Sequence, residues 1–212
     1  MTPGLRDYLD PLPFCAVLRG ISPAEIDAIG DVLADAGFRI LEVPLNSPQP
    51  FASIERLAAR FGARCLVGAG TVIDPADVAR VADAGGRVVV MPHADTRVIA
   101  AAKSRGLTCM PGVATPTEAF AALAAGADAL KMFPAEALPP AALKAWRAVL
   151  PEGTIVLAVG GMRPETLRPY WDAGADGFGT GSNLYKPGVP AAEVAAVARA
   201  YRDAARALPA RA

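Results

Sequence analysis

A glycine turn recurs along almost the whole chain of 212 residues. Each turn follows a helical pattern and precedes a short apolar run, and the glycines are Gly37, Gly62, Gly85, Gly106, Gly126, Gly153 and Gly174. Successive glycines lie 25, 23, 21, 20, 27 and 21 residues apart. That distance accommodates a helix of about 10 to 12 residues, a strand of about five and two short loops. Glycine suits the position after a helix, because it readily adopts the left-handed conformation needed there.

Eight apolar runs alternate with these helices and are predicted to be strands. They span residues 14–18, 39–43, 64–68, 87–91, 107–110, 128–132, 154–159 and 176–179. Several of them are apolar at every position, which is typical of strands covered on both faces. Proline and a nearby acid begin several intervening segments, as in Asp74–Asp77 and Thr115–Glu118. This combination favours the first turn of a helix.

Eight strand–helix units without a linker or a change in composition predict a parallel (β/α)8 TIM barrel, a single domain over residues 1–212. A short helical segment is expected before the first strand. Ala191–Ala207 is predicted to be the closing C-terminal helix, with Val194, Val197 and Tyr201 on one face. An open doubly wound sheet is the alternative, which is disfavoured because such sheets usually have about five or six strands.

Charge and hydropathy exclude several classes of protein. Lys+Arg and Asp+Glu number 21 each, so no general attraction to nucleic acid or to an anionic membrane is expected. Apolar runs such as Val88–Met91 are too short to span a membrane, and the N-terminus carries charges and prolines where a signal peptide needs an apolar core. Cys15, Cys65 and Cys109 lie in apolar segments without metal-ligand spacing and are predicted to be buried, reduced thiols. We therefore expect a cytoplasmic protein.

Two charged residues interrupt strands that are otherwise apolar. Glu42 lies within Ile40–Pro44 and Lys131 within Ala129–Phe133, and residues of these types are rarely buried without a partner or a function. Because side chains alternate along a strand, both are expected to point into the barrel. Apolar surroundings lower the pKa of an amine, which makes Lys131 a candidate nucleophile. A structural Lys131–Glu42 ion pair is the alternative, which is disfavoured by the cost of desolvating both charges.

Glycines cluster after the last two predicted strands. Gly160 and Gly161 follow the strand at 154–159, and Gly181 and Ser182 follow the next one. Glycines let backbone N–H groups approach a ligand closely, and a short helix predicted to begin at Ser182 would direct its positive end toward an anion. Loops after strands seven and eight of such barrels commonly bind phosphate. A phosphate site is therefore predicted here.

Two further polar residues follow predicted strands. Arg19 comes after Ala16–Leu18 and Thr71 after Gly68–Gly70. An arginine at the mouth of a barrel suits a substrate carboxylate, although composition alone is equally compatible with a surface ion pair. His93 is interpreted as a solvated loop residue. Together these groups suit a substrate with a ketone, a carboxylate and a distal phosphate, and predict Schiff-base formation followed by carbon–carbon cleavage.

Five strings of residues resemble those of the 2-keto-3-deoxy-6-phosphogluconate and phosphogalactonate aldolases. They occur in order over residues 13–188, and they are Val17–Ile21, Glu42–Pro48, Gly68–Val72, Leu130–Pro134 and Ala158–Gly161. The resemblance implies a class I aldolase without metal or cofactor, usually a homotrimer, that acts on a phosphorylated keto-deoxy sugar acid. It implies that Lys131 forms the Schiff base and that Glu42 is the acid–base working through water. It also implies binding of the pyruvyl end by Arg19 and Thr71, and of the phosphate by Gly160, Gly161, Gly181 and Ser182.

Two positions favour the galactonate branch of that family. The gluconate branch typically has arginine where this chain has Asn46, and threonine where it has Val159. Asn46 would leave carboxylate binding mainly to Arg19. The resemblance therefore implies cleavage of 2-dehydro-3-deoxy-6-phosphogalactonate to pyruvate and D-glyceraldehyde 3-phosphate, in galactonate degradation, with the gluconate epimer as the alternative substrate. Ala135-Glu136, where serines are common, and His93, where asparagine is expected, bear on fine specificity only.

Other functions are compatible with the same barrel. A phospho-sugar isomerase or epimerase would use Glu42 as the base and Lys131 only as an electrostatic group. A non-catalytic phospho-ligand sensor would bind without turnover, and the lack of an appended DNA-binding or signalling segment speaks against it. Metal-dependent class II aldolase chemistry is disfavoured because His93 is the single histidine of the sequence.

Overall fold

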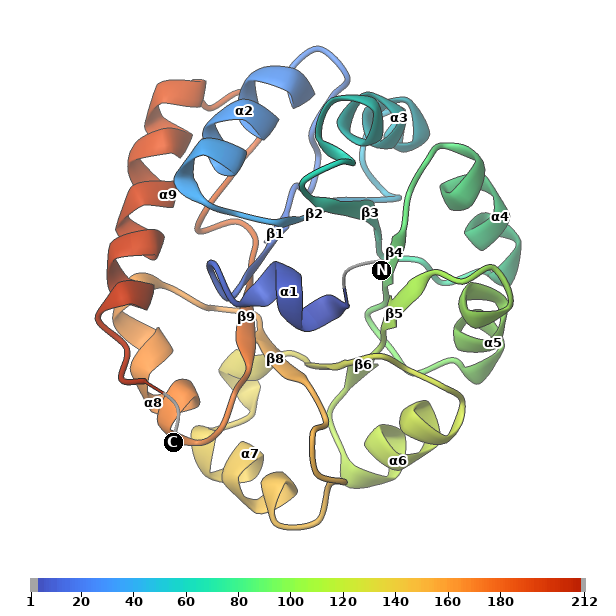
Figure 1. Cartoon of the computed structure of the whole chain (residues 1–212), viewed down its shortest axis with the longest axis vertical. Helices are drawn as coiled ribbons and strands as arrows, with labels where there is room; N and C mark the ends of the chain where they lie inside the picture. Colours follow the sequence, from blue (N-terminus) through green and yellow to red (C-terminus); the bar gives the residue numbers. More distant parts are fainter. Residues whose placement is uncertain (1–3, 211–212) are drawn as a thin grey trace.

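The computed structural model describes residues 4–210, in which strands and helices alternate around a ring (Figure 1). All strand pairs are parallel. The strands are β1 (Phe14–Val17), β2 (Ile40–Pro44), β3 (Leu66–Gly70), β4 (Val88–Val90), β5 (Thr108–Met110), β6 (Gly112–Val113), β7 (Leu130–Met132), β8 (Val156–Val159) and β9 (Gly177–Thr180).

The ring is closed at Pro111. Its strand order is β5-β4-β3-β2-β1-β9-β8-β7-β6, so β5 and β6 stand at the two ends of the sheet while being adjacent in the chain. Proline has no N–H group and interrupts the strand, but its carbonyl accepts a hydrogen bond from Lys131 N at 2.8 Å. β5 and β6 are therefore two halves of one barrel strand, paired with β4 and β7 respectively. The predicted eight-unit barrel is confirmed, and the open sheet is excluded.

Helices cover the outside of the barrel (Figure 1). They begin as the sequence predicts at several places: Asp74 accepts a hydrogen bond from Ala76 N at 2.9 Å, and Thr115 and Glu118 form a capping box. The outer helices are α2 (Ile26–Ala36), α3 (Pro50–Phe61), α4 (Pro75–Asp83), α5 (Thr96–Ser104), α6 (Pro116–Ala124), α7 (Pro140–Arg147), α8 (Leu167–Asp172) and α9 (Ala191–Arg206). Two short 3₁₀ segments, η1 (Ala135–Ala137) and η2 (Pro164–Thr166), follow β7 and β8. No helix within residues 4–210 combines the length and hydrophobicity that a membrane crossing requires.

The side chains form two apolar clusters, one between strands and helices and one inside the barrel. The interior cluster is closed at one end by α1 (Leu5–Leu9), which lies across the ring in Figure 1. Tyr8 and Leu9 of this helix pack with inward-facing strand residues such as Cys15 and Leu66. Because α1 precedes β1, it plugs the N-terminal end of the barrel and leaves the C-terminal end for a ligand site.

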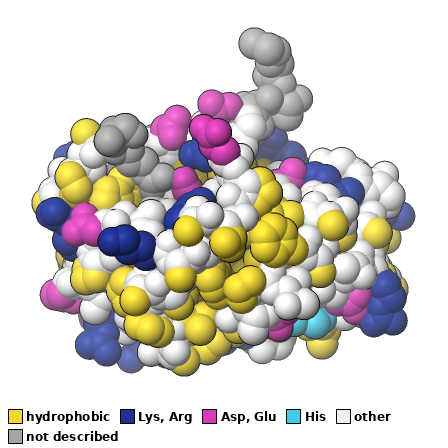
Figure 2. Space-filling model, turned by 90° about the horizontal axis from the view of Figure 1, so that it is seen from below, with side chains coloured by type: hydrophobic (Ala, Val, Ile, Leu, Met, Phe, Trp, Pro, Cys, Tyr) yellow, Lys and Arg dark blue, Asp and Glu magenta, His cyan; other side chains and the backbone are white. Residues whose placement is uncertain are grey.

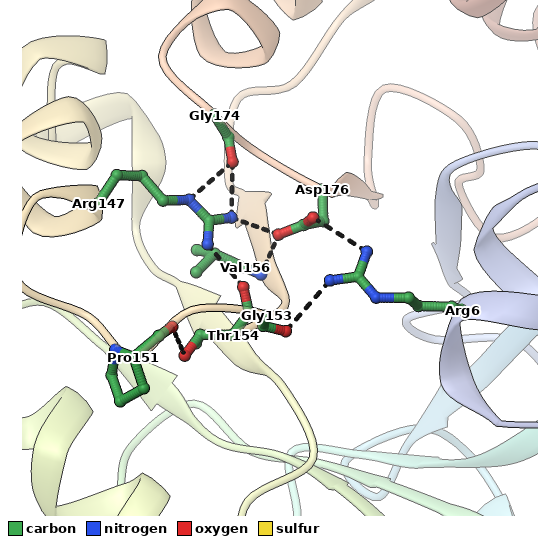
Figure 3. A network of polar contacts seen from close by, with 8 residues as sticks. All are labelled: Arg6, Arg147, Pro151, Gly153, Thr154, Val156, Gly174 and Asp176. Carbon is green, nitrogen blue, oxygen red and sulfur yellow. Dashed lines mark hydrogen bonds and ion pairs between the residues drawn. The ribbon is translucent and has the colours of Figure 1, made fainter. Parts of the chain in front are cut away.

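A polar network holds this closed end together (Figure 3). Asp176 is buried and is paired with Arg147, and it also accepts hydrogen bonds from Val156 N at 2.8 Å and from Arg6 Nη1 at 3.4 Å. Arg147 also donates to the carbonyl of Gly174. The network therefore links α1, α7 and the segments that begin β8 and β9, at the end of the barrel away from the candidate site.

Candidate active site

Lys131 lies at the centre of β7, in the barrel interior. Its neighbours Leu130 and Met132 belong to the outer apolar layer, so the alternation that the sequence predicts turns Lys131 inward. The side chain is only 7% exposed, and its Nζ lies 4.6 Å from the centroid of the Phe133 ring. Burial lowers the pKa of Lys131, while the charge of Glu42 opposes that shift. Burial thus increases the fraction of the Lys131 amine that is neutral and nucleophilic.

Glu42 is the second buried charge and lies on β2. It is 1% exposed, and burial raises its pKa to about 7, against the opposing influence of Lys131 and Arg19. Its Oε2 has no hydrogen-bond partner among the described residues. No Lys131–Glu42 ion pair is present within residues 4–210. The structural ion pair considered from the sequence is therefore not formed, and a buried carboxylate oxygen is left for another partner.

Arg19, Asn46 and Thr71 form a cluster where β1, β2 and β3 end. Arg19 donates through Nη1 to Asn46 Oδ1 at 2.7 Å and through Nη2 to Thr71 Oγ1 at 3.3 Å. Thr71 adopts a left-handed conformation with φ of 55°, which is unusual for a non-glycine residue. The two contacts orient the exposed guanidinium toward the mouth of the barrel, so Asn46, predicted as a specificity residue, here positions Arg19.

The predicted phosphate residues lie in one cavity with Lys131 and Arg19. The cavity measures about 340 Å³, and the predicted residues that line it are Arg19, Lys131, Val159, Gly160, Gly161, Gly181 and Ser182. Gly160 and Gly161 both have positive φ, 109° and 68°, which permits the tight turn after β8. Lys131 and the two glycine-rich loops thus line one cavity.

One detail of these loops differs from the sequence prediction. Ser182 does not begin a helix: residues 181–185 form a single turn, in which the N–H groups of Leu184 and Tyr185 donate to Gly181 O. The next residues include Pro187 and Gly188, and proline cannot donate the hydrogen bond that would continue a helix. The loop therefore presents backbone N–H groups and the Ser182 hydroxyl, without the dipole of a helix.

A model of the KDPG and KHG aldolase family matches residues 6–200. The chain belongs to this family. The 2-dehydro-3-deoxy-6-phosphogalactonate aldolase of Escherichia coli K12 is 47% identical over 197 residues, which cover 91% of this chain and 96% of that protein.

Solved structures agree with the family assignment. A structure described as native KDPGal superposes with a TM-score of 0.91 at 46% identity, covering 92% of this aldolase and 95% of that chain. The KDPG aldolase of Legionella pneumophila, solved with pyruvate captured as a covalent carbinolamine, is 26% identical with a TM-score of 0.74 and covers 93% of this chain and 94% of its own. A carbinolamine is the addition product of an amine and a ketone, which in that structure is pyruvate.

Several residues of the cavity in this aldolase were not predicted from the sequence. Phe133, Arg163 and Asn183 also line it, and Asn183 Nδ2 donates to Met162 O at 3.2 Å. Glu136, which the sequence linked only to fine specificity, lines the same cavity. Arg163 could have been suspected because it stands two residues after the paired glycines. The others lie in loops whose paths no periodic pattern in the sequence indicates.

Glu25 is another residue that sequence reasoning missed. Helix α2 begins one residue after it, and the Glu25 carboxylate accepts hydrogen bonds from Tyr185 Oη at 3.1 Å and Gly188 N at 2.9 Å. Ser22 Oγ also donates to it at 2.6 Å. Glu25 therefore ties the loop that carries Ser182 to the start of α2.

The remaining reactive side chains stay apart from this site or are inert within it. Cys15 lies inside the barrel, and burial together with the charge of Glu42 raises the pKa of its thiol, so it remains protonated. His93 is exposed. Among residues 4–210, no group of three His, Cys, Asp or Glu side chains could hold a metal ion.

Proposed function

We propose that this chain is a class I aldolase that cleaves 2-dehydro-3-deoxy-6-phosphogalactonate to pyruvate and D-glyceraldehyde 3-phosphate. The observation that carries the proposal is the joint cavity, in which a buried Lys131 and the paired glycines Gly160 and Gly161 face the same hollow. An amine and an anion cradle held in one cavity suit a substrate whose ketone and phosphate stand at opposite ends.

Lys131 begins the reaction by attacking the C2 ketone. Loss of water gives a protonated imine, which withdraws electrons from C3 far more strongly than the ketone does. The lowered pKa of Lys131 supports this role, because only the neutral amine is nucleophilic. Arg19, held by Asn46 and Thr71, binds the C1 carboxylate and fixes the ketone against the amine.

Glu42 acts on the C4 hydroxyl through a water molecule. As its carboxylate accepts the hydroxyl proton, the C3–C4 bond breaks, the aldehyde leaves and the electron pair passes to the imine as an enamine. Protonation of C3 and addition of water then release pyruvate and restore Lys131. The unpartnered Oε2 and the pKa of about 7 support an acid–base role.

Val159 and Asn46 support the galactonate substrate over the gluconate epimer. Val159 lines the same cavity as Lys131 and the paired glycines, and its apolar side chain offers no hydrogen bond to a C4 hydroxyl. The deciding experiment measures pyruvate release from the two phosphorylated epimers side by side. Faster release from the galactonate form supports the proposal, and comparable rates or a preference for the gluconate form would overturn the choice of epimer.

An isomerase or epimerase would not require a covalent intermediate. Borohydride reduction in the presence of pyruvate distinguishes the two reactions, because it converts an imine to a stable secondary amine. The aldolase proposal predicts irreversible inactivation with a mass increase on the tryptic peptide that contains Lys131. Full activity after this treatment would favour isomerisation, with Glu42 as the base.

We further propose a cytoplasmic homotrimer that works in galactonate degradation. Free, buried Cys15, Cys65 and Cys109 support a reducing compartment.

Exposed apolar residues support contacts between copies of the chain. Phe120 on α6 is 44% exposed and Val149 after α7 is 56% exposed. The side of the molecule carrying these two helices shows hydrophobic side chains among scattered charges (Figure 2). Such exposed residues suit contacts between copies. Light scattering during gel filtration should give about three times the chain mass of 21.8 kDa, and a monomer would contradict the proposal.

A further inference from the structure

An acidic side chain, Glu136, lies against the glycine-rich loops. It belongs to η1, and a Cβ built on Gly161 would stand 2.7 Å from its Oε2 and 3.0 Å from its Cβ. Glu136 and Gly161 also line the same cavity as Ser182. The carboxylate therefore borders the space that the phosphate of the proposed substrate would enter.

The backbone that carries Glu136 is held in place from both sides. Tyr170 Oη donates to Ala135 O at 2.7 Å and to Leu138 O at 3.0 Å. Burial, and then the charge of Glu136, raise the pKa of Tyr170, so the phenol remains a donor. These hydrogen bonds hold the backbone on either side of Glu136 and so place the residue beside Gly161.

No other charge within the described part of the chain neutralises Glu136. Its carboxylate makes no hydrogen bond or ion pair with any residue in 4–210, including Arg163 of the same cavity. The other charged residues lining the cavity, Arg19, Lys131 and Arg163, are all basic. A carboxylate in this position weakens the binding of a phosphate dianion, but it does not repel an uncharged group.

We propose that Glu136 is a specificity-determining residue at the distal end of the substrate, an inference that rests on the proposed function. A phosphate monoester is mostly dianionic above pH 6 to 7, and the Glu136 carboxylate repels it. The hydroxyl of an unphosphorylated 2-keto-3-deoxy sugar acid can instead donate a hydrogen bond to the same oxygen. Glu136 thereby reduces the factor by which the glycine-rich loops bind phosphorylated substrates more tightly than unphosphorylated ones.

The experiment compares Glu136→Gln with the wild type on both kinds of substrate. Glutamine keeps the shape and removes the charge, so KM for the phosphorylated substrate should fall about two- to fivefold, as expected for a partly solvated charge pair. KM for the unphosphorylated acid should stay constant or rise. Glu165→Gln is the matched control, because Glu165 is an exposed acid of η2 outside the cavity. The ratio of KM for the unphosphorylated acid to KM for the phosphorylated substrate decides the outcome. If this ratio is unchanged in Glu136→Gln, or changes equally in Glu165→Gln, the inference is overturned.

A second measurement does not depend on turnover. Titration with inorganic phosphate should show about two- to fivefold tighter binding to Glu136→Gln than to the wild type, with no change in Glu165→Gln. Equal phosphate affinities would overturn the role of Glu136 even if both substrates are cleaved. If Glu136→Gln binds phosphate more tightly but neither substrate is cleaved, Glu136 still weakens phosphate binding, and the proposed reaction is contradicted.

Discussion

Gly70 leaves the space in which the Glu42 carboxylate lies. A Cβ built on Gly70 would overlap both carboxylate oxygens of Glu42, across the β2–β3 pair. Any side chain at position 70 would therefore have to displace the proposed acid–base group. Glycine is needed at position 70 because it has no side chain, and not because the backbone there has an unusual conformation.

Gly70→Ala should therefore reduce kcat about 10²-fold or more, since a displaced acid–base group loses most of its contribution. A double-mutant cycle with Glu42→Gln tests the cause. If Gly70→Ala acts through Glu42, it should reduce kcat only slightly once Glu42 is already glutamine. A full additional loss in the double variant would mean that Gly70 matters for another reason.

The pH dependence of kcat/KM follows from the same carboxyl group. Glu42 must be ionised to accept a proton, and burial raises its pKa to about 7, so kcat/KM should rise with pH through that value. The neutral form of Lys131 is also favoured at higher pH, which acts in the same direction. Glu42→Gln should abolish the ionisation near pH 7, whereas Glu165→Gln should keep the wild-type profile. A wild-type profile that falls between pH 6 and 8 would contradict this assignment.

Much of the site could be predicted because it depends on strands. The glycine spacing fixed the number of units, and side-chain alternation along β2 and β7 placed Glu42 and Lys131 inside the barrel. Boundaries were less accurate: β3 starts at Leu66 instead of residue 64, because the N–H groups of Arg64 and Cys65 still bond to Phe61 O after α3.

The loop residues could not be predicted in the same way. Glu136 is placed at the cavity by the hydrogen bond from Tyr170 to the backbone of η1. Glu25 contacts the neighbouring loop through its hydrogen bond with Tyr185. These contacts join residues 35 and 160 positions apart, and no local pattern encodes such distances. The helix predicted at Ser182 is absent for a local reason, since Pro187 cannot donate the hydrogen bond that would continue the single turn.

The buried carboxylate should also reduce stability at high pH. The pKa of Glu42 is raised from 4.5 to about 7 in the folded chain, so folding favours the protonated form, and stability is lost as pH rises through about 7. The stability of Glu42→Gln relative to the wild type, measured as the free energy of unfolding, should therefore be greater at pH 8 than at pH 5. The change should reach up to about 3 kcal/mol. Urea unfolding at the two pH values measures the difference, and a difference no larger than that of Glu165→Gln would refute it.

Lys131→Ala should abolish activity more completely than Glu42→Gln. Removal of the amine removes the covalent route, whereas an acid–base group contributes about 10² to 10⁴ in rate. Lys144→Ala is the control, because Lys144 is exposed on α7. Pyruvate release and borohydride labelling should both disappear in Lys131→Ala only. Equal, small losses in Lys131→Ala and Glu42→Gln would count against both proposed roles.

Asp176→Asn should destabilise the fold from the end of the barrel opposite the site. Asp176 is 8% exposed and is paired with Arg147 while accepting a hydrogen bond from Val156 N, so loss of its charge leaves a partly buried guanidinium without its counter-ion. We expect a loss of about 2 to 4 kcal/mol in the free energy of unfolding. Asp172→Asn breaks the exposed Arg168 pair of α8 and should cost less than about 0.5 kcal/mol. Urea unfolding compares the two variants, and equal losses would show that the network in Figure 3 contributes no more than a surface pair.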